Sequence, residues 1–179
     1  LGLTPGNGAT LLSVLPLFFV LFAIPAGYIA GKIGRRNTIS IGLLSLILMM
    51  VLLYITPASA LLTGIAPLPL VGIPLVADGP RMLTLAGVLL IIGGIGWACI
   101  NINSLPMIVD LTNAARIGTF TGLYYLFSTL SAIVGPNLNG WAVKLTGNNY
   151  NVIMLIAPVF MAIALWLILG VKRGEASFN

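Results

Sequence analysis

Four side chains in this sequence have the types and the spacing to bind a small polar molecule. Trp97 and Asn101 are four residues apart, and so are Tyr124 and Ser128, so each pair would share one face of a helix. An aromatic ring beside an amide or a hydroxyl can stack on a neutral polar solute and hydrogen-bond to it. Tyr125 is a fifth candidate for lining such a cavity. The alternative is that these groups only form hydrogen bonds between helices.

Covalent and metal chemistry are poorly supported by the composition. The sequence has no histidine, and Cys99 is its only cysteine, which excludes an internal disulfide and a thiolate metal site. No acidic residue lies deep enough in an apolar stretch to pair with a nucleophilic serine. We therefore expect no enzymatic activity, no bound metal and no cofactor.

The elements that position these residues must lie in a membrane. Of the 179 residues, 59% are hydrophobic and 6% are charged, whereas soluble domains carry roughly 25% charged residues. The net charge of +5 comes from a few cations beside apolar stretches, so it indicates membrane topology and not nucleic-acid binding. The fold class is therefore an all-α integral membrane protein. Because the chain begins at Leu1 and not at Met, we expect a fragment of a longer protein.

Five apolar stretches are long enough to cross roughly 30 Å of hydrocarbon as helices. These predicted spans are 11–30, 39–55, 83–103, 117–134 and 152–171. Short connections are expected at 31–38 and 104–116. Repeated prolines in 56–82 predict a long loop with a partly buried or re-entrant portion, and a sixth span is the alternative.

The distribution of lysine and arginine predicts the orientation, because short cytoplasmic connections carry an excess of both. With 31–38 and 104–116 inside and 56–82 outside, six cations are cytoplasmic: Lys32, Arg35, Arg36, Arg116, Lys172 and Arg173. Only Arg81 and Lys144 remain outside. We expect a multi-pass protein of the cell membrane with its N-terminus outside and its C-terminus in the cytoplasm.

The spans differ in polarity, which predicts their neighbours. Spans 39–55 and 152–171 are almost wholly apolar and are expected to face lipid over most of their surface. Spans 83–103 and 117–134 carry amides and hydroxyls, so they should face protein or a water-filled cavity. The pairs Gly27/Gly31 and Gly118/Gly122 have the Gly-x-x-x-Gly spacing that lets another helix dock closely.

The sequence around the first basic turn resembles the signature of the major facilitator superfamily. The family pattern is G-x-x-x-D-[RK]-x-G-R-[RK], and the chain reads Gly27-x-x-x-Gly31-Lys32-x-Gly34-Arg35-Arg36. Gly31 replaces the aspartate, a loss that is usual for the copy between helices eight and nine. The resemblance implies that the five spans are helices eight to twelve, most of the C-terminal six-helix bundle, with helix seven missing.

The resemblance also implies how these helices are arranged. Helices nine and twelve would be peripheral, and ten would line the central cavity. Helices eight and eleven would form its walls and contact the other half of the transporter. The stretches 101–110 and 171–175 are similar to the branch of sucrose and other glycoside symporters.

An acid at the end of the third span can pair with the basic turn. Asp110 lies at the predicted depth of Arg35 and Arg36, and in the family such pairs latch the cytoplasmic side in one state of the transport cycle. The resemblance thus implies a latch of Lys32, Gly34, Arg35, Arg36, Asp110 and Arg116. The alternative is an interfacial ion pair without such a role.

The sequence therefore predicts a fragment of a secondary active transporter that moves a small polar solute, expected to be a sugar, by alternating access. Its partners would be the lipid bilayer, the missing N-terminal half and the solute, with a proton or sodium ion if it is a symporter. No acidic residue lies inside a span, so a coupling carboxylate would belong to the missing half. The alternative is a non-transporting membrane module or a truncated assembly subunit.

Overall fold

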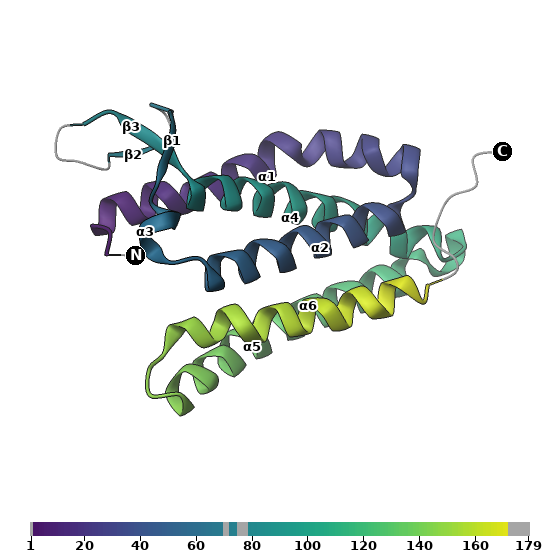
Figure 1. The fold of residues 1–179 in the computed structure, drawn as a ribbon. Helices are drawn as coiled ribbons and strands as arrows, with labels where there is room; N and C mark the ends of the chain where they lie inside the picture. The colour runs from purple at the N-terminus through teal and green to yellow at the C-terminus, as the bar shows by residue number, and fades with distance from the viewer. Residues whose placement is uncertain (1, 70–71, 75–78, 172–179) are drawn as a thin grey trace.

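Five long helices form the body of the computed structural model, which describes residues 2–69, 72–74 and 79–171. They are α1 (Pro5–Ile33), α2 (Arg35–Ile55), α4 (Leu85–Asp110), α5 (Ile117–Leu145) and α6 (Ile153–Leu169). Each lies in a stretch long and apolar enough to cross a membrane, which confirms the predicted all-α membrane fold. Figure 1 shows that successive long helices run in alternating directions.

The connections at the basic end are shorter than the predicted loops. Only Gly34, with φ of 89°, separates α1 from α2, and this left-handed conformation favours glycine. Helix α4 continues to Asp110, seven residues beyond the end of the predicted span. Polar side chains do not end these helices, because Asn37 and Ser104 hydrogen-bond back to carbonyls one turn earlier on their own chain.

The segment between α2 and α4 forms a small antiparallel sheet. After α3 (Ala58–Leu61), the strands are β1 (Gly64–Pro67), β2 (Ile73–Pro74) and β3 (Arg81–Thr84), in the order β1-β3-β2. Ile73 and Leu61 are buried against the ends of the helices. Within the described residues this segment holds no sixth span, since its prolines lack the N–H that a helix needs.

Helix α4 is the centre of the bundle because it packs on both α1 and α2. Glycines allow the backbones to approach closely. A Cβ added at Gly42 of α2 would lie 2.6 Å from the carbonyl oxygen of Gly96 on α4. On the opposite side, a Cβ at Gly94 would lie 3.1 Å from the Cβ of Phe18 on α1. These contacts hold three helices together without bulky side chains between them.

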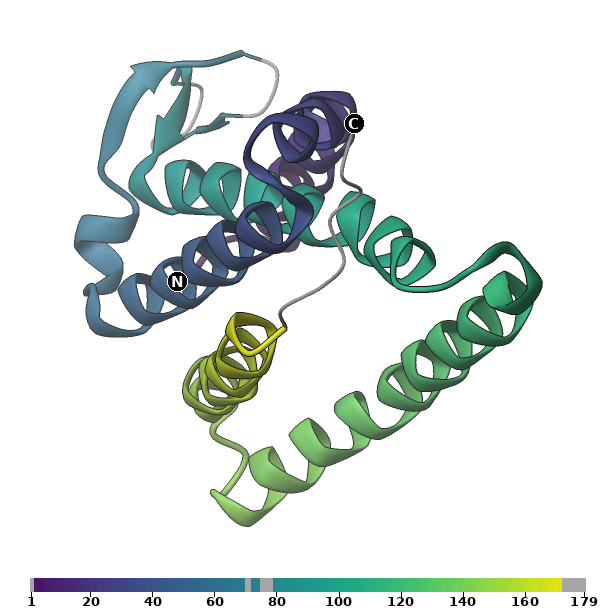
Figure 2. The ribbon, with the colours of Figure 1, turned by 90° about the vertical axis from the view of Figure 1, so that its right-hand side faces the viewer.

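Helices α2 and α5 differ in how much of their surface the described chain covers. Helix α2 was expected to face lipid over most of its surface, but it lies between α4 and α6 and buries residues along both contacts. Helix α5 diverges from the other helices in Figure 2, and only Val143 is buried on it within the described chain. Gly42 explains the position of α2, because the missing side chain lets this apolar helix approach α4 closely.

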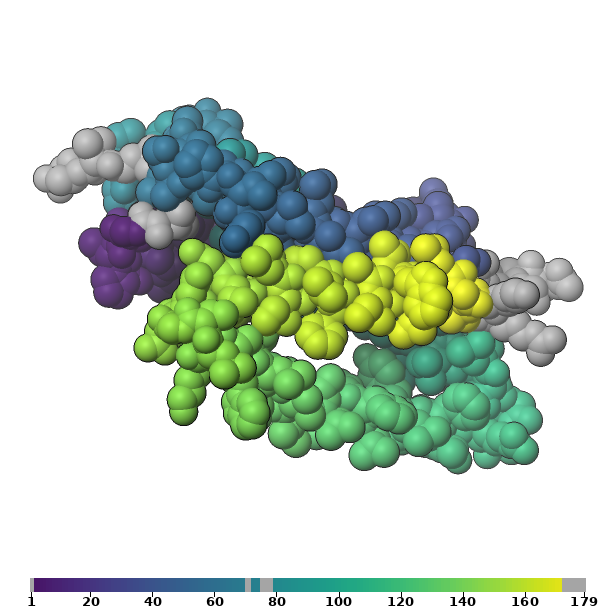
Figure 3. Space-filling model, turned by 60° about the horizontal axis from the view of Figure 1, so that its bottom comes forward, coloured from purple at the N-terminus to yellow at the C-terminus, as the bar shows by residue number. Residues whose placement is uncertain are grey.

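Helices α5 and α6 are only loosely packed against each other. A slot separates them along part of their length in Figure 3. A cavity of 380 Å³ between them is lined by Ser131, Val134, Gly135, Leu138, Asn139, Ala157, Phe160 and Met161. Most of these side chains are apolar, so this cavity is suited to hydrocarbon and not to a polar solute.

The close packing of α2 on α4 makes a testable prediction for Gly42→Ala. The added methyl would meet the backbone of Gly96, so the helices must separate, at a cost of about 1–3 kcal/mol. Thermal unfolding, followed by dye labelling of the buried thiol of Cys99, should show a lower midpoint. The matched control is Gly140→Ala, where the Cβ has no neighbour within 4 Å; its midpoint should not fall. Equal losses in both variants would contradict the packing.

Candidate functional site

The basic turn is tied to α4 by an ion pair between Arg35 and Asp110. The Nε of Arg35 lies 2.9 Å from Oδ2 of Asp110, and the two side chains are 28% and 20% exposed. The expected proximity is therefore confirmed. Within the described residues, Oδ2 is buried and receives no well-aligned hydrogen bond, so the attraction is mainly between charges. Gly34 makes the turn tight enough for Arg35 to reach the last residue of α4.

The other residues of the predicted latch have different partners. Lys32 places its Nζ 4.5 Å from the centre of the Tyr28 ring, a cation–π contact within α1. Arg36 donates a hydrogen bond to the carbonyl of Leu169 at the end of α6. Arg116 is exposed and forms no ion pair within the described chain. The function of these residues as a latch stays a prediction.

Two of the six predicted cytoplasmic cations, Lys172 and Arg173, lie outside the described residues. The described cations still divide between the two ends of the bundle, because Arg81 begins β3 and Lys144 ends α5. Both positions are at the end opposite the α1–α2 turn (Figure 1).

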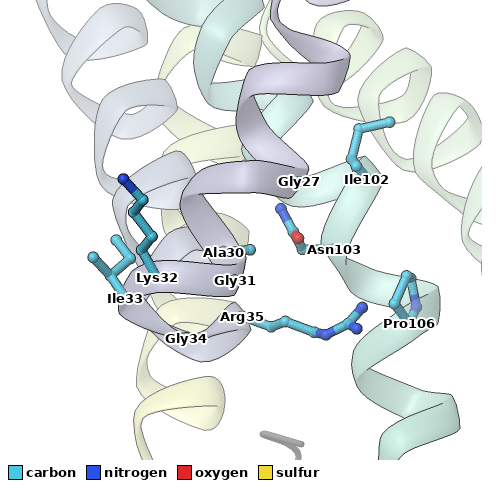
Figure 4. Close-up of a pocket in the computed structure, with 10 residues that line it drawn as sticks. All are labelled: Gly27, Ala30, Gly31, Lys32, Ile33, Gly34, Arg35, Ile102, Asn103 and Pro106. Atoms are coloured by element: carbon cyan, nitrogen blue, oxygen red, sulfur yellow. The ribbon is translucent and has the colours of Figure 1, made fainter. Parts of the chain in front are cut away.

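A cavity of 570 Å³, here called the turn cavity, lies between the end of α1 and α4. Its lining is Gly27, Ala30, Gly31, Lys32, Ile33, Gly34, Arg35, Ile102, Asn103 and Pro106. Figure 4 shows Arg35 extending across the cavity toward α4, whereas Lys32 points away from it. The small side chains of α1 create this space, and Arg35 gives it a positive charge.

Asn103 lines the turn cavity but was not among the predicted site residues. It is only 2% exposed, and its Nδ2 donates hydrogen bonds to the carbonyls of Cys99, at 2.8 Å, and Ala26, at 3.4 Å. The second bond joins α4 to α1 within the apolar interior. The sequence could have identified Asn103, because it places an amide inside an apolar span. An amide in such a span requires a hydrogen-bond partner.

A second cavity, here called the aromatic cavity, brings together four of the five predicted solute-lining residues. It measures 480 Å³ and lies between α4 and α5. Its lining is Trp97, Ile100, Asn101, Ser104, Ile108, Phe120, Leu123, Tyr124, Phe127, Ser128 and Ser131. Among the described residues that line it, none carries a charge. The arrangement suits a neutral molecule with both apolar and hydroxyl surfaces.

The polar groups of the aromatic cavity are only partly engaged with the protein. Asn101 donates from Nδ2 to the carbonyl of Trp97 at 3.2 Å, which fixes the amide along its own helix. Trp97 is 44% exposed, so much of its ring is open for stacking. Tyr125 does not line the cavity. Its ring packs edge-on against the Tyr124 ring, with 5.4 Å between the two ring centres.

The predicted helix-docking glycines are largely open. A Cβ at Gly27 would meet Ile102 of α4 at 3.6 Å, which is ordinary packing. At Gly31, Gly118 and Gly122 a Cβ would meet no described atom within 4 Å. The docking function of these glycines therefore stays a prediction, and its partner would be a helix beyond the described residues.

Both cavities offer groups suited to noncovalent binding. No group of three or more His, Cys, Asp or Glu residues that could hold a metal occurs in the described parts of the chain. The aromatic cavity offers stacking surfaces, amides and hydroxyls. The turn cavity offers a guanidinium and a buried amide.

The family model described as Major Facilitator Superfamily matches residues 1–179. Comparisons with curated proteins and with solved structures find no match.

The Arg35–Asp110 geometry predicts a measurable coupling. Arg35→Gln and Asp110→Asn should each destabilise the protein, and the double variant should lose about 1 kcal/mol less than the sum, as expected for a partly exposed pair. Thermal unfolding of the four proteins provides the cycle. As a control, Arg116→Gln combined with Asp110→Asn should be additive. Additivity within about 0.3 kcal/mol for the first cycle as well would contradict the ion pair.

Proposed function

The chain belongs to the Major Facilitator Superfamily, and on this basis we propose that it forms the C-terminal part of a secondary active transporter for a small neutral polar solute. Members of this family are transporters and not enzymes, and the five apolar helices embed the chain in a membrane. Transport would proceed by alternating access, in which two halves move around a central site.

The aromatic cavity is the observation that supports a solute site. Two i, i+4 pairs on different helices, Trp97/Asn101 and Tyr124/Ser128, line the same 480 Å³ space. A sugar has an apolar ring face and several hydroxyls, so it can stack on an indole or phenol ring while its hydroxyls bond to amides and serines. A charged solute would find no counter-charge among the described lining residues. We therefore assign a sugar as the expected solute class.

The exposed surface of α5 supports the proposal that a second transporter half completes the site. On the resemblance to the family, α1, α2, α4, α5 and α6 would be helices eight to twelve. The open glycines Gly31, Gly118 and Gly122 would then lie at the contact between halves. Coupling to a proton or sodium ion would require a carboxylate in that other half, since α4 and α5 contribute no acid to the aromatic cavity.

The cation distribution supports an orientation with the α1–α2 turn in the cytoplasm. Lys32, Arg35, Arg36 and Arg116 lie at one end of the bundle, and Arg81 and Lys144 at the other. Cytoplasmic connections carry the excess of such residues. The chain would therefore enter from the outside and finish inside the cell.

Tyr124 and Tyr125 provide a matched test of the solute site. They are adjacent and chemically identical, but only Tyr124 lines the aromatic cavity. Tyr124→Ala should weaken the apparent affinity for the transported sugar about threefold to tenfold, the value of one aromatic stacking contact. The measurement is uptake of a panel of labelled neutral sugars and charged analogues into proteoliposomes that contain the complete transporter.

Tyr125→Ala is the control and should leave the affinity unchanged. Equal losses for both tyrosines would contradict the placement of the site. Uptake of the charged analogues in preference to the neutral sugars would contradict the solute class.

Cysteine labelling tests the orientation. In a Cys99→Ala background, Asn37→Cys reports on the end with the basic turn and Asn149→Cys on the opposite end, because both positions are exposed. An impermeant maleimide added to intact cells should label position 149 and reach position 37 only after permeabilisation. The reverse pattern would contradict the orientation.

A further inference from the structure

Arg36 links the α1–α2 turn to the end of α6. Its Nη2 donates a hydrogen bond to the main-chain carbonyl of Leu169, the last residue of that helix. Its Nε is buried and has no hydrogen-bond partner within the described chain, so the guanidinium is enclosed by protein on that side. The two residues are separated by 133 positions in the sequence, so this contact joins distant parts of the fold.

The packing beneath this hydrogen bond brings the same two helices together. Ile39 and Leu43, within two turns of Arg36 on α2, are buried in a cluster with Met107 of α4 and with side chains of α6. These partners from the last part of the chain are Met161, Leu165, Ile168 and Val171. The hydrogen bond therefore lies at the end of a continuous α2–α6 contact.

Within the described chain, the last turn of α6 is closed by two short main-chain bonds, from the N–H of Gly170 to the carbonyl of Leu167 and from the N–H of Val171 to the carbonyl of Ile168, and neither uses the carbonyl of Leu169. The C-cap of this helix, Gly170, has φ of −76° and does not adopt the left-handed conformation of a glycine-terminated helix. The last turn also contains no basic residue. The final carbonyls of a helix carry a partial negative charge and need donors. Arg36 supplies both a donor and a positive charge at this point.

The neighbouring arginine makes the corresponding contact with a different helix. Arg35 pairs with Asp110, the last residue of α4, while Arg36 bonds to the last residue of α6. Two adjacent cations in one turn thus meet the C-terminal ends of two helices. Each helix end attracts positive charge, and the two contacts share no partner.

We infer that Arg36 is the C-terminal cap of α6, supplied from α2, and that it holds these two helices together independently of the Arg35–Asp110 pair. Arg36 is therefore a positioning residue for α6 and not part of the contact with α4.

Hydrogen–deuterium exchange of the complete protein in lipid nanodiscs tests the inference. Arg36→Gln removes the charge and shortens the donor, so amides at 165–171 should exchange about fivefold faster, as expected for the loss of a charged helix cap. Amides at 104–110, at the end of α4, should be unchanged. The matched control, Arg35→Gln, removes the same charge one residue earlier. It should speed exchange at 104–110 and leave exchange at 165–171 unchanged.

The conservative variant separates a cap from a general loss of folding. Arg36→Lys keeps the charge but loses the planar guanidinium, so exchange at 165–171 should lie between those of the native protein and Arg36→Gln. If Arg36→Gln does not fold, this intermediate increase, again absent at 104–110, is the deciding result. Unchanged exchange at 165–171 in the folded Arg36 variants would overturn the inference. An equal increase at both helix ends, or the same increase in the Arg35 variant, would also overturn it.

Discussion

The arrangement of this protein depends on the close approach of α4 to its two neighbours. Between membrane helices there is little hydrophobic gain from association, because lipid is as apolar as leucine. What remains is van der Waals contact and hydrogen bonding, and both require the backbones to be near each other. The glycines at 42, 94 and 96 provide that proximity on two sides of α4. Once α1, α2 and α4 are fixed, α6 is placed against α2, and both cavities form along α4.

Much of the fold could be predicted because length and polarity act locally. An apolar stretch of about 20 residues must become a helix in a bilayer, since no other single segment satisfies its own backbone there. The same reasoning placed Trp97, Asn101, Tyr124 and Ser128 on two helix faces that meet at one cavity. Helix ends were less predictable, because polar side chains such as that of Ser104 bond back to the helix and do not end it.

The features that were missed depend on contacts between distant residues. Composition cannot tell an apolar helix in lipid from one enclosed by protein, so the position of α2 between α4 and α6 was not foreseen. In the small sheet, Ile73 pairs with Met82 and joins two short strands. These strands lie among prolines and are too short to show a periodic pattern in the sequence. Tyr124 and Tyr125 are identical side chains that point in different directions from α5. Which of them faces the aromatic cavity depends on how α5 is rotated relative to α4, and the sequence alone does not give that rotation.

The turn between α1 and α2 constrains how the molecule can move. A single non-helical residue, Gly34, joins the two helices, so there is no loop between them that could absorb a displacement of one helix relative to the other. If α1 tilts or rotates about its axis, the next residues, Arg35 and Arg36, must be carried along with it. A displacement of α1 would therefore be passed to α2 and, through these two arginines, to the ends of α4 and α6.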